Sequence, residues 1–406
     1  MTTRTTCRGC GSTSLAAVLS LGETPLANGL LDADDLALPE ETFPLDVIFC
    51  RQCALVQITE DVPPAKLFSE YLYLSSYSDT MVAHARELAR RLILEETLDA
   101  GSLVVEIASN DGYLLQNYVE RAIPVLGVEP AANIARIAEG RKIPTVVNFF
   151  TSSLATSLDR RADVVHAHNV LAHVPDPVDV LAGIAALLTD GGVAVIEVPY
   201  LRELVERCEF DTIYHEHLCY FSLTALVFLA RRAGLEIHDV EQVAIHGGSL
   251  RLFLSRPGSR PRKSEVESLA SMERGLGMRS ERYYSDFASR VVALRDALVG
   301  TLARLKSEGA SIAAYGAAAK GATLLNYAGI TAETISFVVD RSPHKQGKFI
   351  PGARIPILEP DELLRRQPDY CLLLPWNFES EILEQQSAYR AAGGKFIVPV
   401  PALRIV

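Results

Sequence analysis

Four cysteines near the start of the chain have the spacing of a metal site. They form two Cys-x-x-Cys pairs, Cys7 with Cys10 and Cys50 with Cys53. Each pair can place two thiolates on one turn, and four thiolates fill the tetrahedral coordination of Zn²⁺. Such a site has no open position for water, so the sequence predicts a zinc ion that stabilises the fold and does not catalyse. The alternative is that the pairs are redox-active or coincidental.

A second chemical cluster is the run Tyr214, His215, Glu216 and His217. Histidine is the natural general base at neutral pH because its pKa is about 6.5. In a loop or strand, residues two apart face the same way. This predicts that His215 and His217 share one side, and that Tyr214 and Glu216 share the other. A metal-binding pair and a structural cluster at a domain junction are the alternatives.

The elements that must position this cluster begin near residue 100, where strands and helices alternate. Strands are expected at 103–107, 125–128, 163–168 and 193–199. The first is followed by a tight turn at 108–112 and a helix that starts at 113–115. The alternation predicts an α/β fold with a parallel, doubly wound sheet, whose ligand lies at the carboxyl ends of the strands.

Two residues in this region have a use in binding a cofactor. Gly112 lets the backbone approach a ligand, and Glu129, at the end of the second strand, can hold two ribose hydroxyls. Together with the segment 187–192 before a strand, they resemble class I S-adenosylmethionine-dependent methyltransferases, although the usual Gly-x-Gly turn is absent. The cofactor contacts that the resemblance implies are Glu106, Ala108, Asn110, Gly112, Tyr113, Leu114, Glu129, Pro130, Asn169 and Val170. The alternative is an ordinary Rossmann-like domain with another nucleotide.

Length and composition limit the remaining possibilities. With 406 residues, of which 49% are hydrophobic and 22% charged, the chain is expected to fold into two or three globular domains. The net charge of −11 argues against a nucleic-acid-binding regulator. The N-terminus lacks an apolar signal region, and no apolar run approaches the about 20 residues of a membrane span. With Cys208, Cys219 and Cys371 read as reduced thiols, a cytoplasmic protein is expected.

The last third of the chain predicts a second nucleotide-type fold. Beyond a proline-rich break at 256–261 and a helical stretch, a strand at 311–315 leads into a glycine-rich turn at 316–321, a helix from 322 and a strand at 335–340. This order is typical of a Rossmann-like domain. The backbone amides of the Gly316 turn, with Lys320, suit a phosphate at a helix N-terminus. The weaker candidates are Tyr315, Lys345 and Asn377. A lid or scaffold role is the alternative.

Several motifs occur in one order along nearly the whole chain. They are the cysteine pairs and the segments 75–78, 105–115, 169–177, 214–222 and 246–251. In combination they resemble the sugar C-methyltransferases of deoxysugar biosynthesis. The resemblance implies methylation of carbon 3 of a nucleotide-linked 4-keto sugar by S-adenosylmethionine. It implies three parts: a zinc-binding domain at 1–75, a methyltransferase domain at 76–257, and a domain at 258–406 that holds the thymidine diphosphate of the substrate. A monomer is expected to suffice.

The same resemblance gives roles to individual residues. His217 is the base, Glu216 orients it or binds the sugar, and Tyr214 and Tyr77 donate to the enolate oxygen. His173 takes part in proton transfer or only packs. The C–H beside a ketone has a pKa many units above that of imidazolium, and each unit of this difference costs about 1.4 kcal/mol. Imidazole alone therefore cannot remove the proton, and donors that stabilise the enolate oxygen are needed. The competing hypothesis is an NAD-dependent nucleotide-sugar oxidoreductase that uses the C-terminal turn.

Overall fold

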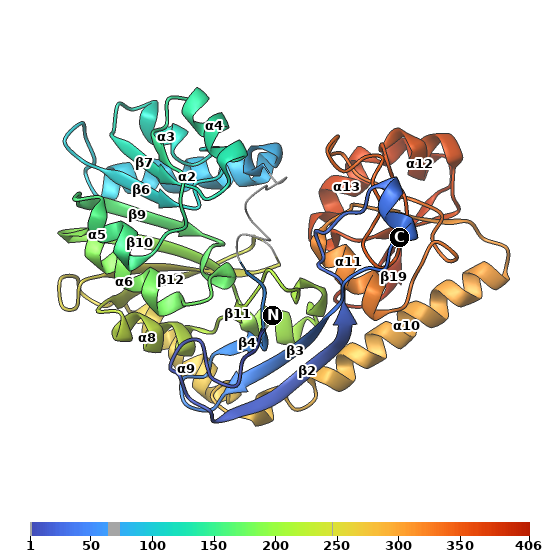
Figure 1. Cartoon of the computed structure of the whole chain (residues 1–406), viewed down its shortest axis with the longest axis horizontal. Helices are drawn as coiled ribbons and strands as arrows, with labels where there is room; N and C mark the ends of the chain where they lie inside the picture. Colours follow the sequence, from blue (N-terminus) through green and yellow to red (C-terminus); the bar gives the residue numbers. More distant parts are fainter. Residues whose placement is uncertain (1, 64–73, 246) are drawn as a thin grey trace.

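Two lobes and a small sheet between them make up the protein (Figure 1). This computed structural model describes residues 2–63, 74–245 and 247–406. In these residues, the strands form sheets of two, four, seven and six strands. No helix in the described ranges is long and apolar enough to cross a lipid bilayer.

The small sheet contains three strands from the N-terminal part of the chain and one strand from the middle. Its order is β11-β4-β3-β2, with β1 and β5 as a separate antiparallel pair. The bounds are β1 Thr2–Thr3, β2 Leu15–Thr24, β3 Phe43–Cys50, β4 Val56–Ile58, β5 Glu60–Asp61 and β11 Cys219–Tyr220. Strand β11 begins two residues after His217, so this sheet holds the end of the 214–217 cluster.

The larger lobe is built on the seven-stranded sheet, with the order β12-β13-β10-β9-β6-β7-β8. Strands β8, β7, β6, β9 and β10 run parallel, and β13 is antiparallel to both β10 and β12. The strands are β6 Val104–Ile107, β7 Val125–Val128, β8 Thr145–Val146, β9 Ala162–His168, β10 Leu188–Pro199, β12 Glu236–Val243 and β13 Ser249–Ser255. Every residue of β6 is buried, as expected for a central parallel strand. The predicted doubly wound sheet is confirmed.

Helices and short 3₁₀ turns alternate with these strands along the chain. They are η2 Ser75–Tyr77, α2 Asp79–Glu95, α3 Gln116–Val119, α4 Ala132–Gly140, α5 Ser152–Ser157, η3 Leu171–His173, α6 Pro177–Leu187, α7 Leu201–Glu206, η4 Phe210–Thr212 and α8 Leu223–Arg232. The helix expected from residue 113 begins only at Gln116, after a series of turns. The segment expected to precede the last parallel strand is part of β10, whose register shifts between Leu188 and Val193.

The smaller lobe carries the six-stranded sheet, with the order β16-β15-β14-β17-β18-β19. Its first five strands are parallel, which confirms the Rossmann-like prediction. The strands are β14 Ile312–Tyr315, β15 Val338–Val339, β16 Ile357–Leu358, β17 Tyr370–Leu373, β18 Lys395–Val398 and β19 Arg404–Ile405. The strand predicted at 335–340 is thus only two residues long.

The helices and 3₁₀ turns after residue 263 belong to the smaller lobe or connect it to the larger one. They are α9 Ser264–Leu276, η5 Glu281–Tyr284, α10 Phe287–Ser307, α11 Ala319–Tyr327, α12 Asp361–Arg366, η6 Trp376–Phe378, α13 Glu379–Gln385 and α14 Ser387–Ala391. Helix α11 begins three residues earlier than expected. Figure 1 shows β2, β3 and α10 running between the lobes.

The parts of the chain share packing. One hydrophobic core includes Phe49 of the small sheet, Phe221 after β11 and Leu302 of α10. The connection between β2 and β3, which contains η1 Ala33–Ala37, reaches the smaller lobe, where Leu31 pairs with Phe349. The domain limits at 75 and 257 stay a prediction.

Candidate active site and zinc centre

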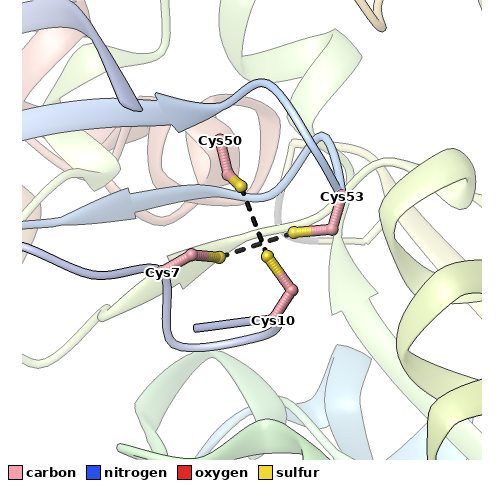
Figure 2. A group of neighbouring side chains, drawn as sticks. All are labelled: Cys7, Cys10, Cys50 and Cys53. Atoms are coloured by element: carbon pink, nitrogen blue, oxygen red, sulfur yellow. Dashed lines mark hydrogen bonds between the residues drawn. The ribbon is translucent and has the colours of Figure 1, made fainter. Parts of the chain in front are cut away.

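The four cysteines converge on one point beside the small sheet (Figure 2). The sulfur atoms of Cys7 and Cys53 are 3.4 Å apart, those of Cys10 and Cys50 are 3.5 Å apart, and all four lie within 4.8 Å of one another. A zinc ion with bonds of about 2.3 Å to four sulfurs needs sulfurs about 3.8 Å apart. Both separations exceed the about 2.05 Å of a disulfide. The hydrogen bond between Cys7 and Cys53 lowers the pKa of Cys7 to about 5 and raises that of Cys53, and burial raises the pKa of Cys10 to about 11, so it is the geometry of the four sulfurs that indicates a metal site.

The turn after β6 has the backbone of a ligand cradle. Ala108, Asn110 and Gly112 have φ values of 51°, 49° and 80°, in the left-handed region. A Cβ atom at Gly112 would lie 2.2 Å from the Ile143 side chain, so the position needs glycine. Asn110 accepts a hydrogen bond from the backbone N–H of Ser75, at 2.9 Å. This bond ties the turn, at the carboxyl end of the central strand, to the start of η2.

Three buried carboxyl groups surround this turn. Glu129 accepts hydrogen bonds from the backbone N–H groups of Asn110 and Ala131, at 3.0 and 2.9 Å. Burial, together with Asp111 and Glu129, raises the pKa of Glu106 well above its usual value. In the described part of the chain, one oxygen of Glu106 and both of Asp111 are buried without a hydrogen-bond partner, and Asp111 forms an ion pair with Arg141 at 3.3 Å. Such acceptors fit S-adenosylmethionine, which brings an ammonium group, a sulfonium and two ribose hydroxyls.

The other predicted cofactor residues differ in where their side chains lie. Asn169 follows β9, has a φ of 55°, and its side-chain oxygen is buried without a hydrogen-bond partner among the described residues. Val170 is buried beside it, and Pro130 follows Glu129. Tyr113 and Leu114 instead belong to a hydrophobic core. Parallel strands end at one edge, so Asn169 and Glu129 lie on the same edge of the sheet.

We expect Glu129→Gln to weaken S-adenosylmethionine binding by about 10- to 100-fold, because hydrogen bonds to a charged group contribute about 1.5–3 kcal/mol. Calorimetry with S-adenosylhomocysteine measures the change. Glu139→Gln is the matched control, since Glu139 is exposed on α4 in the same lobe. Equal affinities of the two variants would remove Glu129 from the cofactor site.

The 214–217 cluster is a turn and not an extended segment. The backbone N–H of His217 donates to the carbonyl of Tyr214 at 2.8 Å, and the two rings lie 4.1 Å apart. His215 points elsewhere: its Nε2–H donates to the carbonyl of Pro44 at 3.0 Å, and its ring packs against Phe43. The expectation that His215 and His217 share a side is therefore wrong, because in a turn residues three apart come together.

His217 has a defined tautomer. Its Nδ1 lies 2.8 Å from the carbonyl oxygen of Thr212, which can only accept, so Nδ1 carries the proton. In the neutral ring, Nε2 then holds the lone pair, and the hydroxyl of Tyr214 donates to it at 2.9 Å. The ring of His173 lies 4.8 Å away, and its Nδ1–H donates to the carbonyl of Glu216 at 2.6 Å. Burial lowers the pKa of His173 to about 4, so it is neutral at pH 7.

Glu216 connects the three parts of the chain. Its carboxylate accepts from the side-chain amide of Asn28 at 2.7 and 2.9 Å. Burial raises its pKa to about 7, against the opposing effects of Asn28 and of Lys345 from the smaller lobe. Tyr77 is 56% exposed. No hydrogen bond or ring contact joins Tyr77 to the 214–217 turn among the described residues, and its role stays a prediction.

The predicted substrate residues of the smaller lobe lie in the segment 315–320 or donate to it or accept from it. The amide of Gly316 donates to Val339 at 2.7 Å, and that of Ala317 donates to the Asp340 carboxylate at 2.7 Å. Both of these amides are bonded within the lobe, and phosphate binding by the rest of the turn stays a prediction. Gly316 is needed for close packing, since a Cβ there would lie 2.5 Å from Pro375.

The side chains of this group lie in three environments. Lys320 donates to Asn377 at 2.8 Å, while Lys345 donates to the carbonyl of Ala317 at 2.8 Å. Tyr315 is 4% exposed and borders a hollow of about 320 Å³ with Arg341. Substrate binding by Tyr315, Gly316, Lys320, Lys345 and Asn377 stays a prediction. His246, the first residue of the 246–251 segment, lies outside the described residues.

Sequence reasoning missed three residues of the site. Asp111 stands in the same turn as Asn110, and a charged side chain inside a ligand turn was an available signal. The sequence gives no signal for Asn28, because only the folding of the chain brings it to Glu216. It gives none for Thr212 either, because Thr212 binds His217 through its backbone carbonyl and not through its side chain.

Comparisons with known proteins agree with this arrangement. Family models match residues 7–68 as a putative zinc binding domain, 81–240 as a methyltransferase domain, and 244–401 as a C-methyltransferase C-terminal domain. The chain is 38% identical to the C-methyltransferase NovU of Streptomyces niveus over 405 residues, 98% of this chain and 96% of that protein.

More distant matches cover the middle of the chain. A ubiquinone biosynthesis O-methyltransferase of Burkholderia pseudomallei is 24% identical over 195 residues, 43% of this chain and 79% of its own. The crystal structure of magnesium protoporphyrin IX methyltransferase from Synechocystis with bound S-adenosylmethionine aligns with a TM-score of 0.35 and 14% identity, over 44% of this chain and 82% of its own. The extent of the match to NovU decides the assignment: the chain belongs to the S-adenosylmethionine-dependent C-methyltransferases with an N-terminal zinc-binding domain.

Proposed function

We propose that the protein methylates carbon 3 of a thymidine-diphosphate-linked 4-keto deoxysugar, with His217 as the base. The resemblance of the ordered motifs to sugar C-methyltransferases supports the substrate class. The family assignment sets aside the oxidoreductase alternative, since it makes the chain a methyltransferase.

The observation that supports the mechanism most directly is the hydrogen bonding of His217. Because Thr212 fixes the proton on Nδ1, the basic lone pair of Nε2 points toward Tyr214. A general base needs this arrangement: one nitrogen anchored, and the other within hydrogen-bond reach of a donor. In the proposed complex, the C3–H of the sugar takes the place of the Tyr214 hydroxyl at Nε2.

Each residue of the turn then has one task. Nε2 of His217 accepts the C3 proton, and the electron pair of the C–H bond moves into an enolate with its charge on the C4 oxygen. The hydroxyl of Tyr214, released from Nε2, donates to that oxygen. S-adenosylmethionine supplies the electrophilic methyl group, and the enolate carbon forms the new C–C bond as the C–S electron pair returns to sulfur.

His173 and Glu216 set the surroundings of the base. A neutral His173 places no positive charge beside the imidazolium that forms on His217, which lowers the cost of taking up the proton. Glu216, buried against Asn28 and with a raised pKa, offers a carboxyl oxygen to a sugar hydroxyl. Lys345 lies close enough to Glu216 to lower its pKa, and its positive charge is suited to the diphosphate of the substrate.

Mass spectrometry in deuterated water tests the proposal. The protein is incubated with S-adenosylmethionine and a thymidine-diphospho-4-keto-2,6-dideoxyhexose. We expect a product one methyl group heavier, and with S-adenosylhomocysteine in place of the methyl donor we expect one deuterium at carbon 3. Deuterium uptake without methylation would support the base and place the error in the choice of sugar. Neither change, with a protein that binds cofactor, would contradict a 4-keto sugar as substrate.

A further inference from the structure

The segment 209–212, which precedes the catalytic turn, is held by the smaller lobe. The ring of Phe210 packs on Tyr327 of α11, with centroids 5.4 Å apart. Asp211 is fully buried, and its Oδ2 accepts a hydrogen bond from the indole N–H of Trp376 at 2.7 Å. This bond joins residues 165 positions apart, from two different lobes.

Lys320 completes this contact between the lobes. Its ammonium group lies 4.3 Å from the centre of the Trp376 ring and donates to Asn377. Burial raises the pKa of Asp211 to about 6, while Lys320 and the Trp376 hydrogen bond lower it. A buried carboxylate that lost one of these partners would keep its desolvation cost without compensation. Lys320, Trp376 and Asn377 therefore support the 209–212 segment.

The segment also carries the anchor of the base. Thr212 follows Asp211, and its carbonyl oxygen accepts the Nδ1–H of His217. The amide of Thr212 donates to the carbonyl of Glu209 at 3.1 Å, and its hydroxyl donates to the same carbonyl at 2.7 Å. Because this 3₁₀ turn is closed by its own hydrogen bonds, a shift of Asp211 moves the Thr212 carbonyl with it.

We propose that Trp376 is a positioning residue for the base: by holding Asp211 it fixes the Thr212 carbonyl, which orients the ring of His217. The inference rests on the proposed function of His217. It gives the smaller lobe a part in the chemistry, since the lobe that is expected to hold the nucleotide also aligns the base in the other lobe. It also gives Lys320 and Asn377 a task other than phosphate binding.

Trp376→Phe tests the proposal, because phenylalanine keeps a ring over Lys320 and removes the N–H donor. We expect kcat to fall about tenfold or more, as for loss of a hydrogen bond to a charged group, with the affinity for S-adenosylhomocysteine within about twofold of wild type. Tyr389→Phe is the matched control. It removes a buried hydrogen bond of 2.8 Å to Pro368 in the same lobe and is expected to keep the wild-type kcat.

The pH profile of kcat separates positioning from a general loss of stability. The ionisable groups that face Asp211 are Lys320 from α11, and Glu209 and Cys208 from its own stretch of chain. Loss of the Trp376 donor raises the pKa of Asp211, so the acid limb of the Trp376→Phe profile should move to higher pH. Tyr389→Phe should leave the limb in place.

Asp211→Asn is the second variant, because its amide oxygen still accepts from Trp376 without titrating. We expect it to retain more activity than Trp376→Phe and to lack the shift of the acid limb. If wild type exchanges deuterium and Trp376→Phe matches Tyr389→Phe in kcat and profile, the inference is wrong and the proposed function stands. If wild type neither exchanges nor methylates, the proposed function fails, and the inference fails with it.

Discussion

Replacing His217 by asparagine is expected to lower kcat by about 10²- to 10⁴-fold, the contribution of a positioned general base. Asparagine is the informative substitute because its amide nitrogen can occupy the place of Nδ1 and donate to the Thr212 carbonyl. The turn should therefore keep its shape and lose only Nε2, the atom that faces Tyr214. Single-turnover methyl transfer and deuterium exchange at carbon 3 measure the loss, and both should fall together.

His215→Gln provides the matched control for this prediction. His215 is two residues away, 1% exposed, and hydrogen-bonded through Nε2–H to Pro44. The glutamine side-chain nitrogen can take the place of Nε2 and keep the hydrogen bond to Pro44. We therefore expect kcat within about threefold of wild type. If His217→Asn keeps more than a tenth of the wild-type exchange rate, or if His215→Gln is the variant that loses it, the base is not His217.

The framework of both lobes follows from the sequence because its signals are local. Apolar runs such as 103–107 and 311–315 are buried on both faces in a parallel sheet, and each is followed by a turn that contains glycine. The spacing of the cysteine pairs predicts their meeting because each pair needs only one tight turn. By contrast, β11 is two residues long, too short for any pattern, and its place beside β4 depends on tertiary packing.

The sequence predicts which types of residue form the site, but not which way their side chains point. The 214–217 run contains the groups that meet His173, but whether His215 or His217 faces the site depends on a turn closed by Tyr214. Lys320 looked suited to a phosphate because of the glycines before it. In the structure Lys320 contacts Trp376 and Asn377, and Asn377 lies 57 positions later in the chain, a distance over which local patterns carry no information.

Removing one zinc ligand is expected to have the largest effect on stability. Structural zinc sites supply about 10–16 kcal/mol of apparent binding energy in small domains, as much as the about 5–15 kcal/mol that keeps a whole domain folded. We expect Cys50→Ser to lose its zinc, to melt at a clearly lower temperature, and to be cut by protease within the small sheet. Elemental analysis should find one zinc per wild-type chain and much less in the variant.

The loss should also reach the chemistry, although a zinc ion with four thiolate ligands does not react. Strand β4 begins three residues after Cys53 and pairs with β11, which follows the catalytic turn. Asn28, from the connection between β2 and β3, donates a hydrogen bond to Glu216. Unfolding of the small sheet therefore removes partners of the catalytic turn, and we expect kcat to fall along with stability. Cys371→Ala, at a thiol buried in the smaller lobe, is expected to keep the zinc and the kcat. A zinc-free Cys50→Ser with wild-type melting and turnover would show that neither the fold nor the catalytic turn depends on the metal.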